Sequence, residues 1–223
     1  MAIILNIETT TKNCSVSLAK NGEVIAIKEL NNGNYSHAEV LHPFISDVLK
    51  EATISFTEID AIAVSKGPGS YTGLRIGVSS AKGLCYAHSI PLISINSLEV
   101  LAAAYTPETS DLLIPMFDAR RMEVFTMVLN AKKEVVSRTE IITSYSFKEL
   151  RDQGRLVLFG NGSNKCKGII PEENTYFVDS LKEPYAQHMV VTATNKFEAK
   201  QFEGTAYFEP FYLKDFYTNP PKV

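Results

Sequence analysis

The sequence predicts an α/β protein built from mixed β-sheets with helical crossovers. Three observations predict this class. Short apolar strand patterns alternate with longer segments of helical periodicity along the N-terminal half. A similar series of strand patterns begins again after the polar segment at residues 105–111, near the middle of the 223 residues. The composition, 45% hydrophobic and 21% charged, is that of an ordinary folded protein and excludes extensive disorder.

The N-terminal half begins with three strand patterns. An apolar run at residues 3–7 is followed by alternation at 15–18, and Asn21-Gly22 predicts a hairpin turn into a third strand at 24–30. Ser36 and Glu39 have the spacing of a capping box, which predicts a helix extending to about residue 52. The elements expected next are a strand at 61–64, a helix at 72–88, a strand at 92–95, and a helix that is capped by Ser97 and ends before Pro107.

The C-terminal half repeats this opening. Its strands are expected at 114–117, 124–129 and 135–142, with an acidic residue after the first strand as in the N-terminal half. The low identity between the halves leaves both duplication and coincidence open. A duplication would give two lobes with a cleft between them. The lobes we expect are residues 1–106 and 107–223.

Charge and cysteine usage narrow the function classes. The net charge of −3 lacks the basic surplus of proteins that bind nucleic acid unaided. Cys14, Cys85 and Cys166 form no metal-binding spacing, which predicts reduced thiols. His37 and His42 are five residues apart, whereas helical metal sites need three or four, so no metal site is expected. No stretch approaches about 20 apolar residues, and we expect a cytoplasmic protein without membrane contact.

A glycine-rich turn joins the strand at 61–64 to the next helix. Its backbone N–H groups and the helix dipole can face an anion, although the glycine spacing fits neither a dinucleotide fingerprint nor a P-loop. A tight strand-to-helix connection explains the same residues, and a polar turn explains the acid and hydroxyls after the first strand. The candidate anion or nucleotide contacts are Glu8, Thr9, Gly67, Gly69, Ser70 and Asp118.

The helix at 72–88 has small residues along one side. Gly73, Gly77 and Ala81 are four apart, which lets another helix approach closely, while Leu74 and Val78 can face the sheet. The small-residue side can accept a partner protein or the helix at 36–52. Ser70 lacks a nucleophile-elbow motif, so nucleophilic catalysis is not expected.

Several segments resemble a known family. They are KGPGSYTGLRIGVSSAKGL at 66–84, SHAEVLHPFI at 36–45, the opening ILNIETT, the central FDARRMEVF and the late YLKDF. Together they resemble the TsaB family of bacterial tRNA threonylcarbamoyladenosine biosynthesis proteins. The resemblance covers nearly the whole chain and implies an actin-like ATPase fold with two ribonuclease-H-like lobes.

The resemblance also implies a function without chemistry of its own. Family members are thought to pair with the transferase TsaD, and with the ATPase TsaE, so that TsaD can move a threonylcarbamoyl group to N6 of adenosine 37 in tRNA. A homodimer is expected when the chain is alone, and tRNA is expected to be reached only through the complex. No cofactor is firmly implied; ATP or ADP at or near the partner interface is the candidate.

The partner surface implied by the family lies on the helices at 36–52 and 72–88. The residues we expect there are His37, Val40, Leu41, Phe44, Gly73, Arg75, Ile76, Gly77, Ser80, Ala81 and Leu84. On this basis Gly77→Leu is expected to abolish partner binding and leave the monomer folded.

Two residues depart from the family pattern. Glu8 stands where Asp is more usual, and Met122 stands where glycine is expected. Two other functions remain open: an independent actin-fold enzyme, either a small kinase or a peptidase using the cleft, and a nucleotide-sensing dimer.

Overall fold

Two five-stranded mixed sheets form the protein, for which the computed structural model describes residues 2–34, 36–141 and 146–213. In each sheet the first three strands are antiparallel and the last two join in parallel. The first sheet has the order β3-β2-β1-β4-β5 and contains β1 (Ile3–Glu8), β2 (Cys14–Lys20), β3 (Glu23–Leu30), β4 (Ala61–Gly67) and β5 (Leu92–Asn96). The second has the order β8-β7-β6-β9-β10 and contains β6 (Asp111–Asp118), β7 (Glu123–Leu129), β8 (Val135–Ile141), β9 (Arg155–Phe159) and β10 (Thr175–Val178). The predicted α/β fold, with a three-strand unit opening each mixed sheet, is confirmed.

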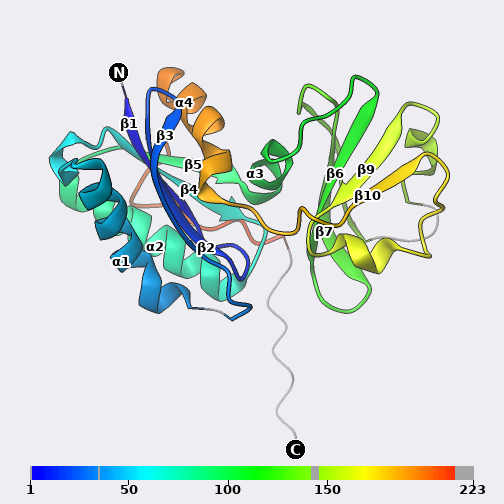
Figure 1. The fold of residues 1–223 in the computed structure, drawn as a ribbon, viewed down its shortest axis with the longest axis horizontal. Helices are drawn as coiled ribbons and strands as arrows, with labels where there is room; N and C mark the ends of the chain where they lie inside the picture. The colour runs from blue at the N-terminus through cyan, green and yellow to red at the C-terminus, as the bar shows by residue number, and fades with distance from the viewer. Residues whose placement is uncertain (1, 35, 142–145, 214–223) are drawn as a thin grey trace, which may run out of the picture.

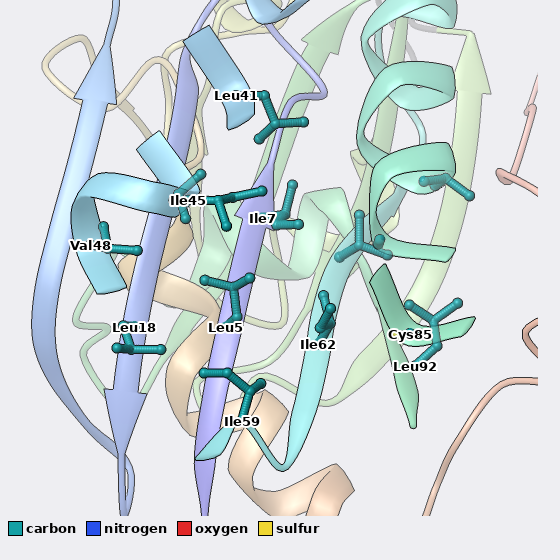
Figure 2. Packing of buried hydrophobic residues seen from close by; sticks show 14 of the residues in the cluster. Leu5, Ile7, Leu18, Leu41, Ile45, Val48, Ile59, Ile62, Cys85 and Leu92 are labelled. Atoms are coloured by element: carbon teal, nitrogen blue, oxygen red, sulfur yellow. The ribbon is translucent and has the colours of Figure 1, made fainter. Parts of the chain in front are cut away.

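Helices cover both faces of the first sheet (Figure 1). One face packs against α1 (His37–Ala52) and α2 (Tyr71–His88), and the other against α4 (Val190–Glu198) and the short 3-10 helix η4 (Ala186–Met189). Side chains of β1 alternate between these layers, and Figure 2 shows Leu5 facing the helix α1 side. Because both faces are covered, nearly every residue of β1 is buried, as is usual for a sheet between two helical layers.

The helix α3 (Ser97–Ala103) lies between the two sheets (Figure 1). Its Val100 packs into the core of the first lobe, whereas Leu98 and Leu101 pack into the core of the second, beside Phe159. One helix therefore contributes to both cores and joins the lobes through apolar contact.

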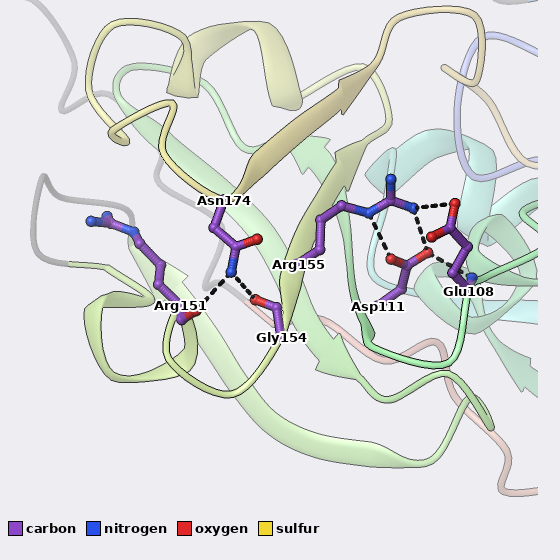
Figure 3. Close-up of polar contacts among 6 residues, drawn as sticks. All are labelled: Glu108, Asp111, Arg151, Gly154, Arg155 and Asn174. Carbon is purple, nitrogen blue, oxygen red and sulfur yellow. Dashed lines mark hydrogen bonds and ion pairs between the residues drawn. The ribbon is translucent and has the colours of Figure 1, made fainter.

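The second lobe carries only short 3-10 helices among its described residues, η2 (Lys148–Leu150) and η3 (Ser163–Cys166). Polar contacts reinforce the ends of its strands (Figure 3). Arg155 on β9 donates from Nε to Oδ1 of the buried Asp111 on β6 at 2.8 Å, and also pairs with Glu108 at 3.2 Å. Burial alone would raise the pKa of Asp111, but the bonds donated by Arg155 and by the backbone N–H of Glu108 hold that pKa below its usual range.

The C-terminal segment returns to the first lobe. Beyond α4, the backbone N–H of Glu203 donates to the carbonyl of Leu92 on β5 at 2.9 Å, and Phe211 N donates to Lys66 O at 2.7 Å. The boundary predicted between residues 106 and 107 falls between α3 and β6, but this segment packs with the first sheet. A single boundary in the chain does not divide the two lobes, because this C-terminal segment contacts residues of the first sheet that are far away in sequence.

Helix starts differ from two of the capping predictions. Ser36 precedes α1 but its side chain makes no capping hydrogen bond, so the predicted capping box is wrong. Asn96, one residue earlier than expected, caps α3 by accepting from Leu98 N at 2.9 Å. Ser70 caps α2 by accepting from Gly73 N at 3.3 Å.

The three cysteines are free and buried. Across the described parts of the chain, no helix combines the length and apolar character needed to cross a bilayer.

Candidate functional site

The loop between β1 and β2 packs on the N-terminal end of α2. Thr9 and Thr10 are buried there. Thr9 Oγ1 donates to the carbonyl of Gly73 at 2.8 Å, and the N–H of Ser70 donates to the carbonyl of Thr10 at 2.7 Å. The polar ETTT segment is therefore a docked loop and not merely a surface turn.

The small residues of α2 leave room for this loop. A Cβ added at Gly73 would meet the carbonyl oxygen of Thr9, and one added at Gly77 would meet the Thr9 hydroxyl. Ala81 is fully buried in the core between α2 and the sheet. The interpretation of Gly73, Gly77 and Ala81 as a groove for a partner helix is therefore wrong, because the chain's own loop and core occupy that side.

Two further residues predicted at the partner surface are also interior. Leu41 is fully buried in the core against the first sheet. His37 is buried, and its Nε2 lies 2.8 Å from the carbonyl oxygen of Thr11. Burial lowers the pKa of His37, although the bond to Thr11 acts in the opposite direction. Both residues position α1 from within.

The remaining predicted residues lie at the outer surface of the helix pair. We call this surface the α1–α2 face; it consists of Val40 and Phe44 on α1 and Arg75, Ile76, Ser80, Gly83 and Leu84 on α2. Ser80 Oγ lies 3.2 Å from Nε2 of His42 and links the two helices. Gly83 was missed from the sequence. It shares a stripe with Ile76 and Ser80, and an added Cβ there would meet nothing within 4 Å.

Both carboxylate oxygens of Glu8 accept hydrogen bonds from neighbouring residues. Its Oε1 accepts from Thr10 N at 2.7 Å and from Thr10 Oγ1 at 2.5 Å, and its Oε2 accepts from Ser65 Oγ. Burial raises the pKa of Glu8, and the bonds from Ser65 and Thr10 offset part of that effect. The carboxyl group is fully buried and holds β1, its loop and β4 together.

Asp118 lies on the other lobe in a different setting. Its exposed carboxylate pairs with Lys165 Nζ at 2.5 Å and accepts from Arg120 N at 2.7 Å. Glu8 and Asp118, the two acidic residues among the candidate anion contacts, therefore differ in burial and in hydrogen-bond partners.

The glycine-rich turn has the geometry of a tight connection. Gly67 has φ +115, a conformation that L side chains rarely adopt. A Cβ at Gly69 would lie 2.6 Å from the carbonyl oxygen of Thr10. The N–H of Ser70 donates to the carbonyl of Thr10, and the N–H of Gly73 donates to the Ser70 hydroxyl. These donors bind within the chain, and the anion or nucleotide role of the turn stays a prediction.

Comparison with known proteins shows the family. Residues 32–219 match the family described as TsaD, tRNA N6-adenosine threonylcarbamoyltransferase. The tRNA threonylcarbamoyladenosine biosynthesis protein TsaB of Bacillus subtilis is 33% identical over 76% of this chain and 75% of that protein. The chain belongs to the TsaB family. TsaB of Haemophilus influenzae is 27% identical, over 95% of this chain and 93% of that one. The solved structure of YeaZ from Pseudomonas aeruginosa has the same fold, with a TM-score of 0.79 at 24% identity, covering 96% of this chain and 100% of that chain.

In this TsaB-family chain the backbone at position 122 does not require glycine. Met122 is 58% exposed, and the left-handed backbone positions of the turn fall on Arg120, with φ 67, and Arg121, with φ 50. The hairpin closes where Ala119 N donates to Glu123 O at 3.1 Å. The departure from the TsaB pattern is therefore accommodated by its neighbours.

The buried carboxyl group of Glu8 predicts a pH-dependent stability. Because folding raises the pKa of Glu8, the folded state holds a proton that the unfolded state releases above the ordinary value of 4.5. This contribution to the free energy of unfolding is fully present below pH 4.5 and is lost as pH rises toward the folded pKa. We expect Glu8→Gln to remove that decline, measured by urea denaturation between pH 4.5 and 8. An identical pH profile in the variant would contradict the assignment.

Proposed function

We propose that this chain is a non-catalytic subunit in the synthesis of threonylcarbamoyladenosine in tRNA, and that it binds the transferase TsaD through the α1–α2 face. Membership of the TsaB family supports the role in threonylcarbamoyladenosine synthesis. The scaffold role and the choice of surface rest on the arguments below.

The apolar character of the α1–α2 face carries the proposal. Val40, Phe44, Ile76 and Leu84 pack against the core with part of each side chain still accessible. Gly83 leaves a flat, open place among them. A surface with accessible apolar side chains around a small residue is typical of a protein-binding site, because removing that apolar surface from water lowers the free energy of the complex.

The kinship of this chain with TsaD supports like-to-like pairing. The match to the TsaD family extends over residues 32–219, which include α1 and α2. Related chains that carry equivalent helix pairs can associate about a pseudo-two-fold axis, as identical chains do in an isologous dimer. The same geometry supports a homodimer when the chain is alone. TsaE then joins as a further subunit, and tRNA is bound by the assembled complex.

The polar groups beside α2 support a structural role. Glu8, Thr9, Thr10 and Ser65 bind one another or the backbone, which stabilises the loop behind the proposed interface. This network is the same one that holds Gly73 against Thr9. ATP or ADP at or near the α1–α2 face stays a prediction of the family resemblance.

Reconstitution tests the proposal directly. We would combine tRNA, threonine, bicarbonate and ATP with the adenylate-forming enzyme, TsaD and TsaE, with and without this chain, and measure modified adenosine by mass spectrometry. We expect product only when the chain is present. Equal product in both reactions would overturn the subunit role and redirect attention to Glu8 and Asp118 as the site of an independent activity.

A further inference from the structure

A small cavity lies at the carboxyl ends of two strands of the first sheet. Its volume is about 120 Å³, and it is lined by Lys66, Asn96, Glu99, Lys196 and Phe211. Lys66 is near the end of β4 and Asn96 is the last residue of β5, and these strands are parallel neighbours. Ligands of α/β sheets characteristically bind in crevices at the carboxyl ends of parallel strands.

Two lysines from distant parts of the chain share this cavity. Lys196 on α4 donates from Nζ to the carbonyl of Ser94 at 2.8 Å, and burial, together with the charge of Lys66, lowers its pKa. Within residues 2–34, 36–141 and 146–213, the ammonium of Lys66 makes no ion pair or hydrogen bond. The lining contains two ammonium groups and one carboxylate, that of Glu99, and the carboxylate of Glu203 also acts on Lys196. Like charges held together in this way are stabilised by a bound anion.

The returning C-terminal segment closes one side of the cavity. Phe211 N donates to the carbonyl of Lys66 at 2.7 Å, and a Cβ at Gly67 would meet the carbonyl oxygen of Phe211. Phe211 therefore lines the cavity beside Lys66 and supplies an apolar wall to it.

We propose that this cavity binds a small oxyanion, a phosphate or a carboxylate. The donors are the ammonium groups of Lys66 and Lys196 and the side-chain amide N–H of Asn96, whose Oδ1 already accepts from Leu98 N. The volume is several times the ~10–15 Å³ that one water needs. The site is separate from the α1–α2 face, and nothing in the proposed function requires it.

The isolated chain titrated with inorganic phosphate, and separately with acetate, tests this site. Binding would be followed by calorimetry and by the ¹⁵N–¹H signals of Lys66 and Asn96. We expect saturable binding that weakens about tenfold or more in Lys66→Met and in Lys196→Met, because each removes a charged donor. Lys132→Met, an exposed lysine on the second lobe, is the matched control and should bind as the parent does.

The possible outcomes distinguish a phosphate ligand from a carboxylate ligand, and both of them from a failure of the proposal. Binding of phosphate alone assigns a phosphate ligand, and binding of acetate alone assigns a carboxylate. Absence of binding by both anions, or equal affinity in Lys66→Met, would overturn the site. Lys66→Met keeps the test valid if Lys196→Met fails to fold, since only Lys196 bonds the backbone of Ser94. No partner protein is present, so this result is independent of the TsaD proposal.

Discussion

Replacing Gly77 by alanine should lower the free energy of unfolding by about 2–3 kcal/mol, within the range for overpacking a buried contact. The added Cβ would meet the hydroxyl of Thr9, which donates to the carbonyl of Gly73. Alanine is the better helix former, so propensity alone predicts the opposite sign. Urea denaturation followed by circular dichroism measures the change. Gly77→Leu should be worse, which corrects the expectation that this variant leaves the monomer folded.

Gly83→Ala is the matched control on the same helix. An added Cβ at Gly83 would meet nothing within 4 Å. The substitution should raise the free energy of unfolding by about 0.5–1 kcal/mol, since glycine is unfavourable inside a helix. Opposite signs at two glycines of α2 would establish which side the β1–β2 loop covers. Stabilisation at both positions would contradict the docking of Thr9 on α2.

Gly83→Arg should weaken binding of TsaD about a hundredfold or more while the chain stays folded, because an unpaired charge buried in an interface costs several kcal/mol. Gly83 lies among the apolar residues of the α1–α2 face, and its surroundings are open in the free chain. Calorimetry or size-exclusion chromatography with TsaD measures the loss. The reconstituted reaction should lose modified adenosine in parallel.

Two control variants separate the effect of losing Gly83 from the effect of adding an arginine. Gly83→Ala should bind TsaD within a few-fold of the parent, because a methyl group adds little bulk to the face. Glu172→Arg places the same side chain at an exposed position of the second lobe, away from α1 and α2, and should leave binding unchanged. TsaD binding at parental affinity by Gly83→Arg would refute the α1–α2 face as the interface.

Local patterns in the sequence were sufficient to predict the five strands of the first sheet and the first three strands of the second. The strand alternation, the Asn21-Gly22 hairpin and the helical spacing of α2 act over a few residues, and each half of the chain contains its own set. The strand β10 and the helix α4 escaped prediction. The strand has only four residues, none of them fully buried, so its alternation is weak.

The tertiary structure alone decided which surface of α2 is free. The spacing of Gly73 and Gly77 shows that small residues share a side, but periodicity does not say what covers that side. The covering residue, Thr9, is 64 positions from Gly73 in the chain. The cavity has the same origin, because Lys66 and Lys196 meet only after α4 returns to the first sheet. Short-range patterns specify faces, whereas long-range packing determines which faces are buried and which can bind.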